Sequence, residues 1–129
     1  DCAVLNNLIE KHSHDWKKIL SEFEQLRKPD ADAIADLALN NFVEMRDKVA
    51  DPVFLLQKKI EGRFSAKYPD KWTPAYGMVT FRPDIRYSEA LKRGNFQQSI
   101  MDEIMQHPDI ENIWDSEEIE NKILSKLNY

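Results

Sequence analysis

Hydrophobic residues recur along most of the chain at the three- and four-residue spacing of an amphipathic helix. The clearest run is Trp16, Ile19, Leu20, Phe23 and Leu26, after which Pro29 ends one helix or begins the next. The same spacing over the rest of the chain predicts a bundle of about five to six helices. They are expected at residues 1–12, 15–27, 30–49, 53–67, 88–107 with a break at 94–95, and 116–127.

The ends of several expected helices carry capping residues. Ser13 is placed to cap the second helix, and Asp51 followed by Pro52 is typical of an N-cap and the first helical position. Asp115 and Glu118 have the spacing of a capping box for the last helix. The first helix has no residue before it to cap its first turn, so we expect the chain to be a piece of a larger protein.

Residues 68–86 break the helical pattern. They contain three prolines, one glycine and several aromatic residues, which predicts an ordered extended segment with a short strand at Met78–Phe81. No repeat or internal boundary divides the chain. The expected fold is therefore one mainly α domain over residues 1–129, with a single Pro- and aromatic-rich extended segment.

Composition and charge exclude several classes of protein. Among 129 residues, 18 are basic and 23 acidic, which gives a net charge of −5 and argues against nucleic acid as a partner. There is no apolar run near the roughly 18 residues that span a bilayer and no signal-peptide pattern, so no membrane partner is expected. The lone Cys2 is compatible with a cytoplasmic location.

The sequence offers no catalytic motif of its own. Its three glycines, Gly62, Gly77 and Gly94, are too far apart for a dinucleotide-binding or phosphate-binding loop, so no cofactor-binding residue is predicted. His12 and His14 point away from each other on a helix, and no third ligand stands at metal spacing. No nucleophile can be placed beside a base. We therefore predict no catalytic residue and no metal site.

Asn41 is the polar position that stands out. On a helical wheel Ile34, Leu37, Ala38 and Met45 lie within about 60° of it, so an amide interrupts the apolar stripe. A buried amide needs a hydrogen-bond partner, which is either another part of the protein, water or a ligand. A structural role is the more common outcome. Glu44, about 60° away on the flank of the same stripe, favours a ligand because it adds a second polar group.

Tyr76 is a second candidate. It stands between Pro74 and Pro83, where a rigid loop could present its hydroxyl to a pocket. The alternative, a loop aromatic that packs on the helices, is equally compatible with the sequence.

Several motifs together resemble the kynurenine 3-monooxygenase family. They are DCAVL at the start, NNFVEMRD at 40–47, RFSAKYP at 63–69, PAYGMVTF at 74–81 and RYSEA at 86–90. The resemblance covers roughly residues 1–98, and no motif is matched from Ser99 onward. It implies the C-terminal portion of a larger α/β flavoprotein, without the flavin-binding domain.

The resemblance implies an FAD- and NADPH-dependent hydroxylase that converts L-kynurenine to 3-hydroxykynurenine. Residues matching Asn41 and Tyr76 would hold the amino-acid end of the substrate, and those matching Glu44 and Met45 would line the pocket. An arginine that pairs with the substrate carboxylate would belong to the missing part. The chain alone would bind neither cofactor and would be inactive, and the intact protein would be cytoplasmic and prokaryotic.

Two further expectations concern partners. Without the flavin-binding domain, the face that contacts it would be exposed, and the chain would self-associate through that face. The alternative function is a free-standing helical interaction module without catalytic activity, whose Asn41 stripe binds a partner helix.

Overall fold

The chain is helical, as its periodicity predicts. The computed structural model describes residues 1–127, and within them there are seven α-helices, one π-helix and no strand. In chain order these are α1 (Cys2–His12), α2 (Trp16–Val43), the π-helix η1 (Glu44–Lys48), α3 (Pro52–Lys67), α4 (Ala75–Phe81), α5 (Tyr87–Ile104), α6 (Ile110–Ile113) and α7 (Glu117–Lys126). The prediction of a mainly helical fold is confirmed.

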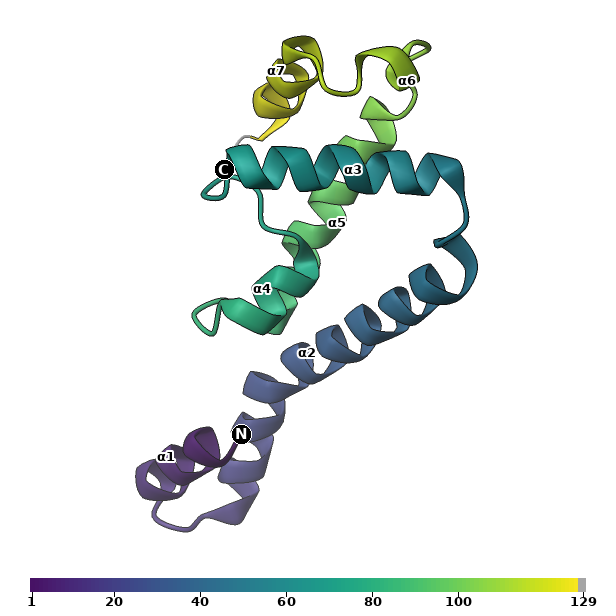
Figure 1. Cartoon of the computed structure of the whole chain (residues 1–129). Coiled ribbons are helices and arrows are strands. Elements are labelled where there is room, and N and C mark those ends of the chain that lie inside the picture. Colours follow the sequence, from purple (N-terminus) through teal and green to yellow (C-terminus); the bar gives the residue numbers. More distant parts are fainter. Residues whose placement is uncertain (128–129) are drawn as a thin grey trace.

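The long helices α2 and α5 organise the molecule. Helix α2 packs against α5 and carries α1 at its start, where the two form an arm that projects from the rest (Figure 1). Helix α3 crosses α5, α4 lies along one end of α5, and α7 packs near the other end (Figure 1). Segments far apart in the sequence thus meet on α5.

Buried apolar residues form two separate clusters. The large cluster joins α3, α5 and α7 through Ile60, Phe64, Trp72, Ile100, Met101, Ile104, Ile110, Ile119 and Ile123. The small cluster joins α2, α4 and α5 through Leu37, Met78 and Ala90. The division between the clusters leaves a space between α2 and α5.

Helix α2 corrects one prediction. The helices expected at 15–27 and 30–49 are a single helix with Pro29 inside it, followed directly by η1. Proline cannot donate a backbone hydrogen bond and disturbs the turn before it. In that turn the Leu26 carbonyl accepts a hydrogen bond from Arg86 Nη2 at 2.8 Å, so a side chain at the start of α5 is anchored on α2 beside the proline.

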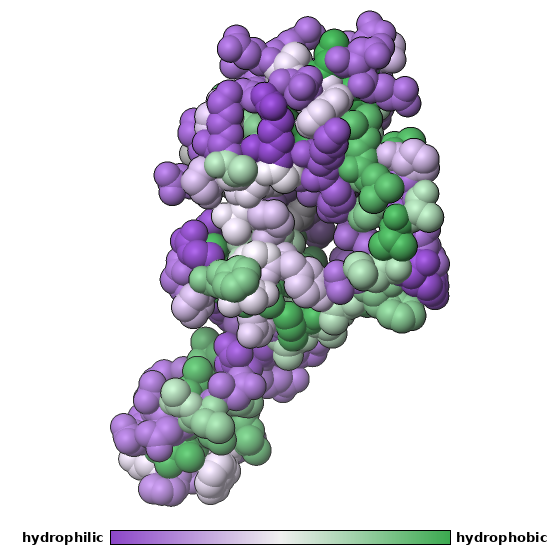
Figure 2. All heavy atoms as spheres, viewed as in Figure 1, coloured by the Kyte–Doolittle hydropathy of each residue, from purple (hydrophilic) through white to green (hydrophobic). Residues whose placement is uncertain are grey.

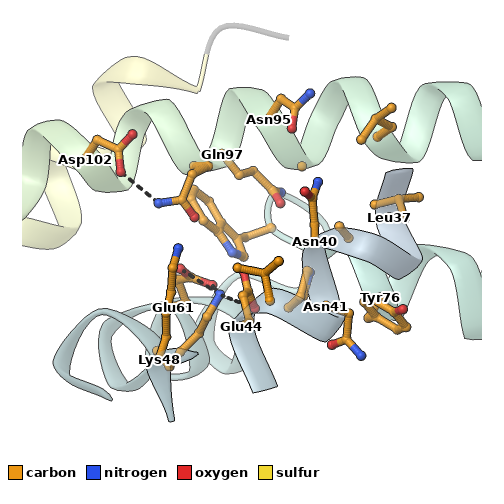
Figure 3. Close-up of a pocket in the computed structure, with 18 residues that line it drawn as sticks. Leu37, Asn40, Asn41, Glu44, Lys48, Glu61, Tyr76, Asn95, Gln97 and Asp102 are labelled. Atoms are coloured by element: carbon orange, nitrogen blue, oxygen red, sulfur yellow. Dashed lines mark hydrogen bonds and ion pairs between the residues drawn. The ribbon is translucent and has the colours of Figure 1, made fainter. Parts of the chain in front are cut away.

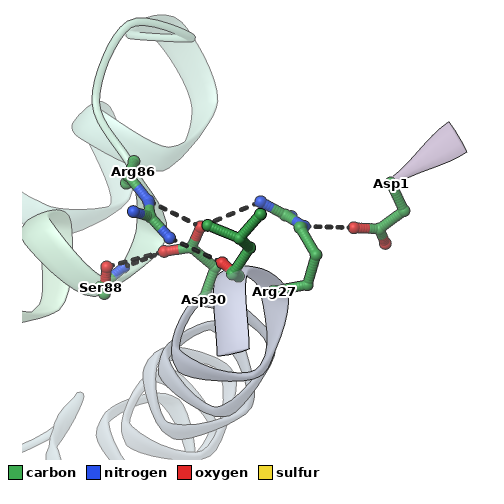
Figure 4. A network of polar contacts seen from close by, with 6 residues as sticks. Asp1, Arg27, Asp30, Arg86 and Ser88 are labelled. Carbon is green, nitrogen blue, oxygen red and sulfur yellow. Dashed lines mark hydrogen bonds and ion pairs between the residues drawn. The ribbon is translucent and has the colours of Figure 1, made fainter. Parts of the chain in front are cut away.

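Asp30, directly after Pro29, fixes the same part of α2 (Figure 4). Its side chain is almost fully buried and accepts hydrogen bonds from Arg27 and Arg86, each at 3.0 Å, and from the Ser88 hydroxyl at 2.7 Å. Burial raises the pKa of Asp30, but the hydrogen bonds from Ser88 and Arg86 outweigh it and leave the pKa below its ordinary value. The ionised carboxylate therefore links α2 to the start of α5.

The segment 68–86 contains a helix where a strand was expected. Residues 75–81 form α4, so the predicted strand at Met78–Phe81 is wrong, although extended residues flank the helix. Pro74 is the N-cap, and its carbonyl accepts from the Met78 amide at 3.0 Å. The helical conformation lets Met78 enter the small cluster, and this tertiary packing overrides the strand propensity of the sequence.

The break expected at Gly94-Asn95 is absent, because α5 runs through both residues. A Cβ atom on Gly94 would lie 2.8 Å from the Ala75 Cβ atom on α4. The glycine therefore serves close helix packing and not helix termination.

Three capping predictions have mixed outcomes. Asp51 caps α3 with Pro52 in its first turn, as expected. Asp15 caps α2, whereas Ser13 ends α1 in the left-handed conformation at φ 49°. Ser116, not Asp115, caps α7 by accepting from the Ile119 amide.

Candidate functional site

A cavity of about 560 Å³ lies between the two clusters. Its size is within the range of small-molecule sites. Trp72 of the large cluster lines one part of it, and Leu37 of the small cluster lines another. The labelled residues in Figure 3 come from five elements, namely α2, η1, α3, α4 and α5.

Three of the four predicted site residues line this cavity. Asn41 is the third residue from the end of α2, Glu44 opens η1, and Tyr76 lies in the first turn of α4. Residues 35 positions apart in the sequence, Asn41 and Tyr76, are thus brought to one space. Tyr76 stands on a helix, so the loop expected to present it is a helix N-terminus instead.

Met45 is not among the lining residues and is 63% exposed. On the helical wheel Leu37 and Glu44 lie on one flank of Asn41, and Met45 lies on the other. Because the cavity is on the Leu37 and Glu44 flank, Met45 faces away from it. Its predicted contact with a substrate would have to involve a surface outside this cavity.

Asn41 is half-buried, and Tyr76 is 43% exposed. Within residues 1–127, neither the Asn41 side-chain amide nor the Tyr76 hydroxyl has a hydrogen-bond partner. Without a partner in the protein, the half-buried amide is left to bind water or a ligand. The two polar groups are thus available to a molecule in the cavity.

Charged and amide groups that the sequence did not single out complete the wall. Lys58 Nζ lies 3.2 Å from a carboxylate oxygen of Glu61 and 4.0 Å from one of Glu44. Gln98 donates to Asp102 at 2.7 Å and accepts from Gln57 at 3.1 Å. These groups come from η1, α3 and α5, so only the tertiary structure brings them together.

The lining suits binding and orientation of a polar molecule. Both signs of charge are present, with Glu44, Glu61 and Asp102 beside Lys48 and Lys58. Among the described residues that line the cavity there is no serine, cysteine or histidine, so the wall offers no paired nucleophile and base. The chemistry that this wall can perform is to place a ligand and satisfy its polar groups.

The residues present do not fit the phosphates of a dinucleotide. Gly62, Gly77 and Gly94 lie within α3, α4 and α5, and no glycine among residues 1–127 has a positive φ. The described part of the chain has no glycine-rich turn that would let a backbone approach a pyrophosphate. Nor do the described residues bring together three potential metal ligands.

No helix in the described part of the chain is both long and apolar enough to cross a membrane.

Comparison with known proteins identifies the relatives of this chain. No family model matches it. It is 57% identical to kynurenine 3-monooxygenase of Flavobacterium johnsoniae over 98% of this chain and 28% of that protein. It is 53% identical to the kynurenine 3-monooxygenase of Flavobacterium psychrophilum over 99% of this chain and 28% of that protein. It is 52% identical to that of Christiangramia forsetii over 98% of this chain and 28% of that protein.

The chain is therefore similar, over nearly its whole length, to part of kynurenine 3-monooxygenases, and the expected resemblance is confirmed. It spans about 28% of the length of these curated relatives. The similarity covers 127 residues, so it extends well past Ser99, where no motif had been matched. The part of the chain after Ser99 is therefore similar to the same proteins as the part before it.

Proposed function

We propose that this chain is the C-terminal, pocket-completing domain of a kynurenine 3-monooxygenase that converts L-kynurenine to 3-hydroxykynurenine. The observation that carries the proposal is the identity of 52–57% to three proteins of that name. The cavity supports it, since its wall includes Asn41, Glu44 and Tyr76, three of the four residues that the resemblance would put beside the substrate. The relatives are bacterial, which supports a prokaryotic origin, and we place the protein in the cytoplasm as part of the same proposal.

In this proposal FAD and NADPH bind a flavin-binding domain outside this chain. When bound, the flavin supplies the activation of oxygen for transfer to the aromatic ring. The residues of this chain hold and orient the substrate and exclude water from it. The isolated chain binds neither cofactor and is inactive.

Asn41 and Tyr76 act on the amino-acid end of the substrate. The amide can both donate and accept, and so can the hydroxyl, so the pair can bind an ammonium and a carboxylate. Glu44 adds a negative charge near the same end. An arginine outside this chain completes the site by pairing with the carboxylate.

The flavin-binding domain is also the proposed partner of the exposed apolar surface. Phe42, Met45, Val49, Val53 and Leu55 are each about half exposed, at 47–63%. Hydrophobic side chains gather along the edge of the molecule where α2 passes into α3 (Figure 2). A surface of this kind is typical of an interface, and in the isolated chain it would promote self-association.

The test is substrate binding by the longer, flavin-loaded protein in which Asn41→Ala or Tyr76→Phe is introduced. Titrating L-kynurenine and following the flavin absorbance should give an affinity about 10- to 150-fold weaker for each variant, since a hydrogen bond to a charged group is lost. Asn7→Ala and Tyr87→Phe, which change the same residue types outside the cavity, are the matched controls.

The same titration separates the two candidate functions. If the protein fails to bind kynurenine, or if both variants bind it like wild type while their melting temperatures fall, the site assignment is wrong. Failure to bind kynurenine would favour the interaction module, whereas unchanged affinity in both variants would leave the proposed enzyme and make Asn41 and Tyr76 structural residues.

A further inference from the structure

A lysine on the cavity wall lies between two carboxylates but is hydrogen-bonded to only one of them. Lys58 Nζ on α3 donates to both oxygens of Glu61, at 3.2 and 3.4 Å. Glu44 Oε2 is 4.0 Å from the same Nζ, which is beyond hydrogen-bond distance. Within residues 1–127 the Glu44 carboxylate accepts no hydrogen bond from another side chain. All three residues line the cavity, and Glu44 and Glu61 lie at the same end of it (Figure 3).

Glu61 is held in place by amide side chains that reach α5. It is 8% exposed, and its Oε1 atom accepts a hydrogen bond from Gln57 Nε2 at 2.7 Å. Gln57 Nε2 also donates to Gln98 Oε1 on α5 at 3.1 Å, and Gln98 Nε2 donates to Asp102 Oδ1 at 2.7 Å. Because two helices contribute to this network, the Glu61 carboxylate is a fixed negative charge for Lys58.

Lys58 has a second contact on its own helix. Its Nζ atom lies 5.3 Å from the centroid of the Phe54 ring, which is a cation–π distance. Glu61 is three residues after Lys58 and Phe54 is four residues before it, so both are its neighbours on the surface of α3. The two contacts keep the ammonium group on α3, away from Glu44 at the start of η1.

Lys48 is the other cation on this wall, and it does not pair with Glu44 either. Its Nζ atom lies 6.0 Å from the centroid of the Phe54 ring, and it forms no ion pair with any residue in the described part of the chain. A carboxylate without a hydrogen-bonded cation can bind the ammonium group of a ligand directly. A carboxylate that already holds a lysine must first release it.

We propose that Glu61 is a positioning residue, which binds Lys58 and thereby leaves Glu44 able to bind an ammonium group in the cavity. This inference rests on the proposed function, in which the ammonium group belongs to the amino-acid end of L-kynurenine. Glu61 acts through Lys58 and not by contact with the ligand. Without the charge of Glu61, a movement of roughly 1 Å brings the flexible lysine within hydrogen-bond distance of Glu44.

The experiment compares two probes on the longer, flavin-loaded protein: L-kynurenine and the analogue in which hydrogen replaces the α-ammonium group. Titration followed by flavin absorbance should show that Glu61→Gln binds L-kynurenine about 10-fold more weakly than wild type, as for one hydrogen bond to a charged group. The affinity for the analogue should be unchanged, because it has no ammonium group. Glutamine keeps the shape of the side chain and its oxygen can still accept from Gln57.

Further substitutions separate positioning from a general effect of charge. Adding Lys58→Met to Glu61→Gln removes the lysine that would pair with Glu44, and the affinity for L-kynurenine should return to the wild-type value. Adding Lys48→Met instead removes one positive charge from the same wall, and binding should stay weak. In Glu44→Gln, the further change Glu61→Gln should have no effect, because the group through which Glu61 acts is already lost.

Lys58→Arg tests the proposal without changing Glu61 or the net charge. The arginine fork has five donors and can bind Glu61 and Glu44 together, so this variant should bind L-kynurenine more weakly and the analogue like wild type. If Glu61→Gln does not fold, Lys58→Arg decides the question: wild-type affinity for L-kynurenine would overturn the proposal.

Three results would overturn the positioning role and leave the proposed function intact. They are wild-type affinity for L-kynurenine in Glu61→Gln, equal loss of affinity for both probes in that variant, and equal rescue of it by Lys58→Met and Lys48→Met. Failure of wild type to bind L-kynurenine would overturn both proposals.

Discussion

Nine buried apolar residues form the large cluster, where α3, α5 and α7 meet. Helix α2 contacts α4 and α5 through the three buried apolar residues of the small cluster and through the buried Asp30. Apolar burial is strong but not directional. The hydrogen bonds of Asp30 are weaker in total, but they set the position of α2 on α5. The cavity lies between the two, so its shape depends on a polar contact as much as on the core.

The largest effect is expected in the large cluster. Phe64→Ala should lower the free energy of unfolding by about 3–5 kcal/mol, because it removes a ring that is 2% exposed and packs against Tyr68 and Trp72. Urea denaturation followed by circular dichroism measures the change. Phe81→Ala is the matched control, since Phe81 is 79% exposed and its loss should cost less than about 0.5 kcal/mol. Equal costs for the two variants would contradict the assignment of the core.

A smaller loss is expected at the polar contact. Asp30→Asn keeps the shape of the side chain but removes the charge that accepts from Arg27 and Arg86, and should cost about 2 kcal/mol at pH 7. Asp36→Asn, on an exposed part of α2, should be nearly neutral. If Asp30→Asn were as harmless as this control, α2 would be held by the small cluster alone.

The pH dependence sharpens the same contrast. Because the pKa of Asp30 is lowered in the folded protein, its contribution is complete above the unfolded value of about 3.9 and is lost as the pH falls through the folded value. The difference in stability between wild type and Asp30→Asn should therefore shrink below about pH 4. Phe64→Ala should show no such convergence with wild type, since no titrating group is removed. Denaturation at pH 7 and at pH 3 measures both.

The sequence was informative where burial follows helical periodicity. The predicted stripe around Asn41 holds in part: Leu37 is buried and Ile34 and Asn41 are half-buried, whereas Ala38 and Met45 are exposed. The sequence also predicts the bounds of α3 and α7 to within about one residue, because Asp51 and the residues around Ser116 are local signals of a helix N-terminus.

The errors arose where a distant contact decides the local structure. Pro29 is typical of a helix end. In the structure Arg86, 57 residues further on, donates a hydrogen bond to the Leu26 carbonyl in the turn before that proline, and local sequence does not reveal this contact. Gly94 likewise reads as a break, although its purpose is the approach of Ala75. The wall formed by Trp72, Gln97 and Glu61 could not be predicted, because it joins α3, α5 and the connection between α3 and α4, whose packing no periodicity describes.

The smallest expected effect distinguishes two glycines in helices. A Cβ on Gly62 meets nothing within 4 Å, so Gly62→Ala should stabilise the chain by about 0.5–1 kcal/mol through helix propensity. Gly94→Ala gains the same propensity but places a methyl group 2.8 Å from the Ala75 Cβ atom, and overpacking of this kind costs about 1–3 kcal/mol. The net result should be a loss of about 1 kcal/mol. If α4 is held tightly against α5, thermal denaturation should show a higher melting temperature for Gly62→Ala and a lower one for Gly94→Ala. Stabilisation by both would mean that α4 moves away freely, and then the cavity wall that Ala75 and Tyr76 form on α4 is not rigid.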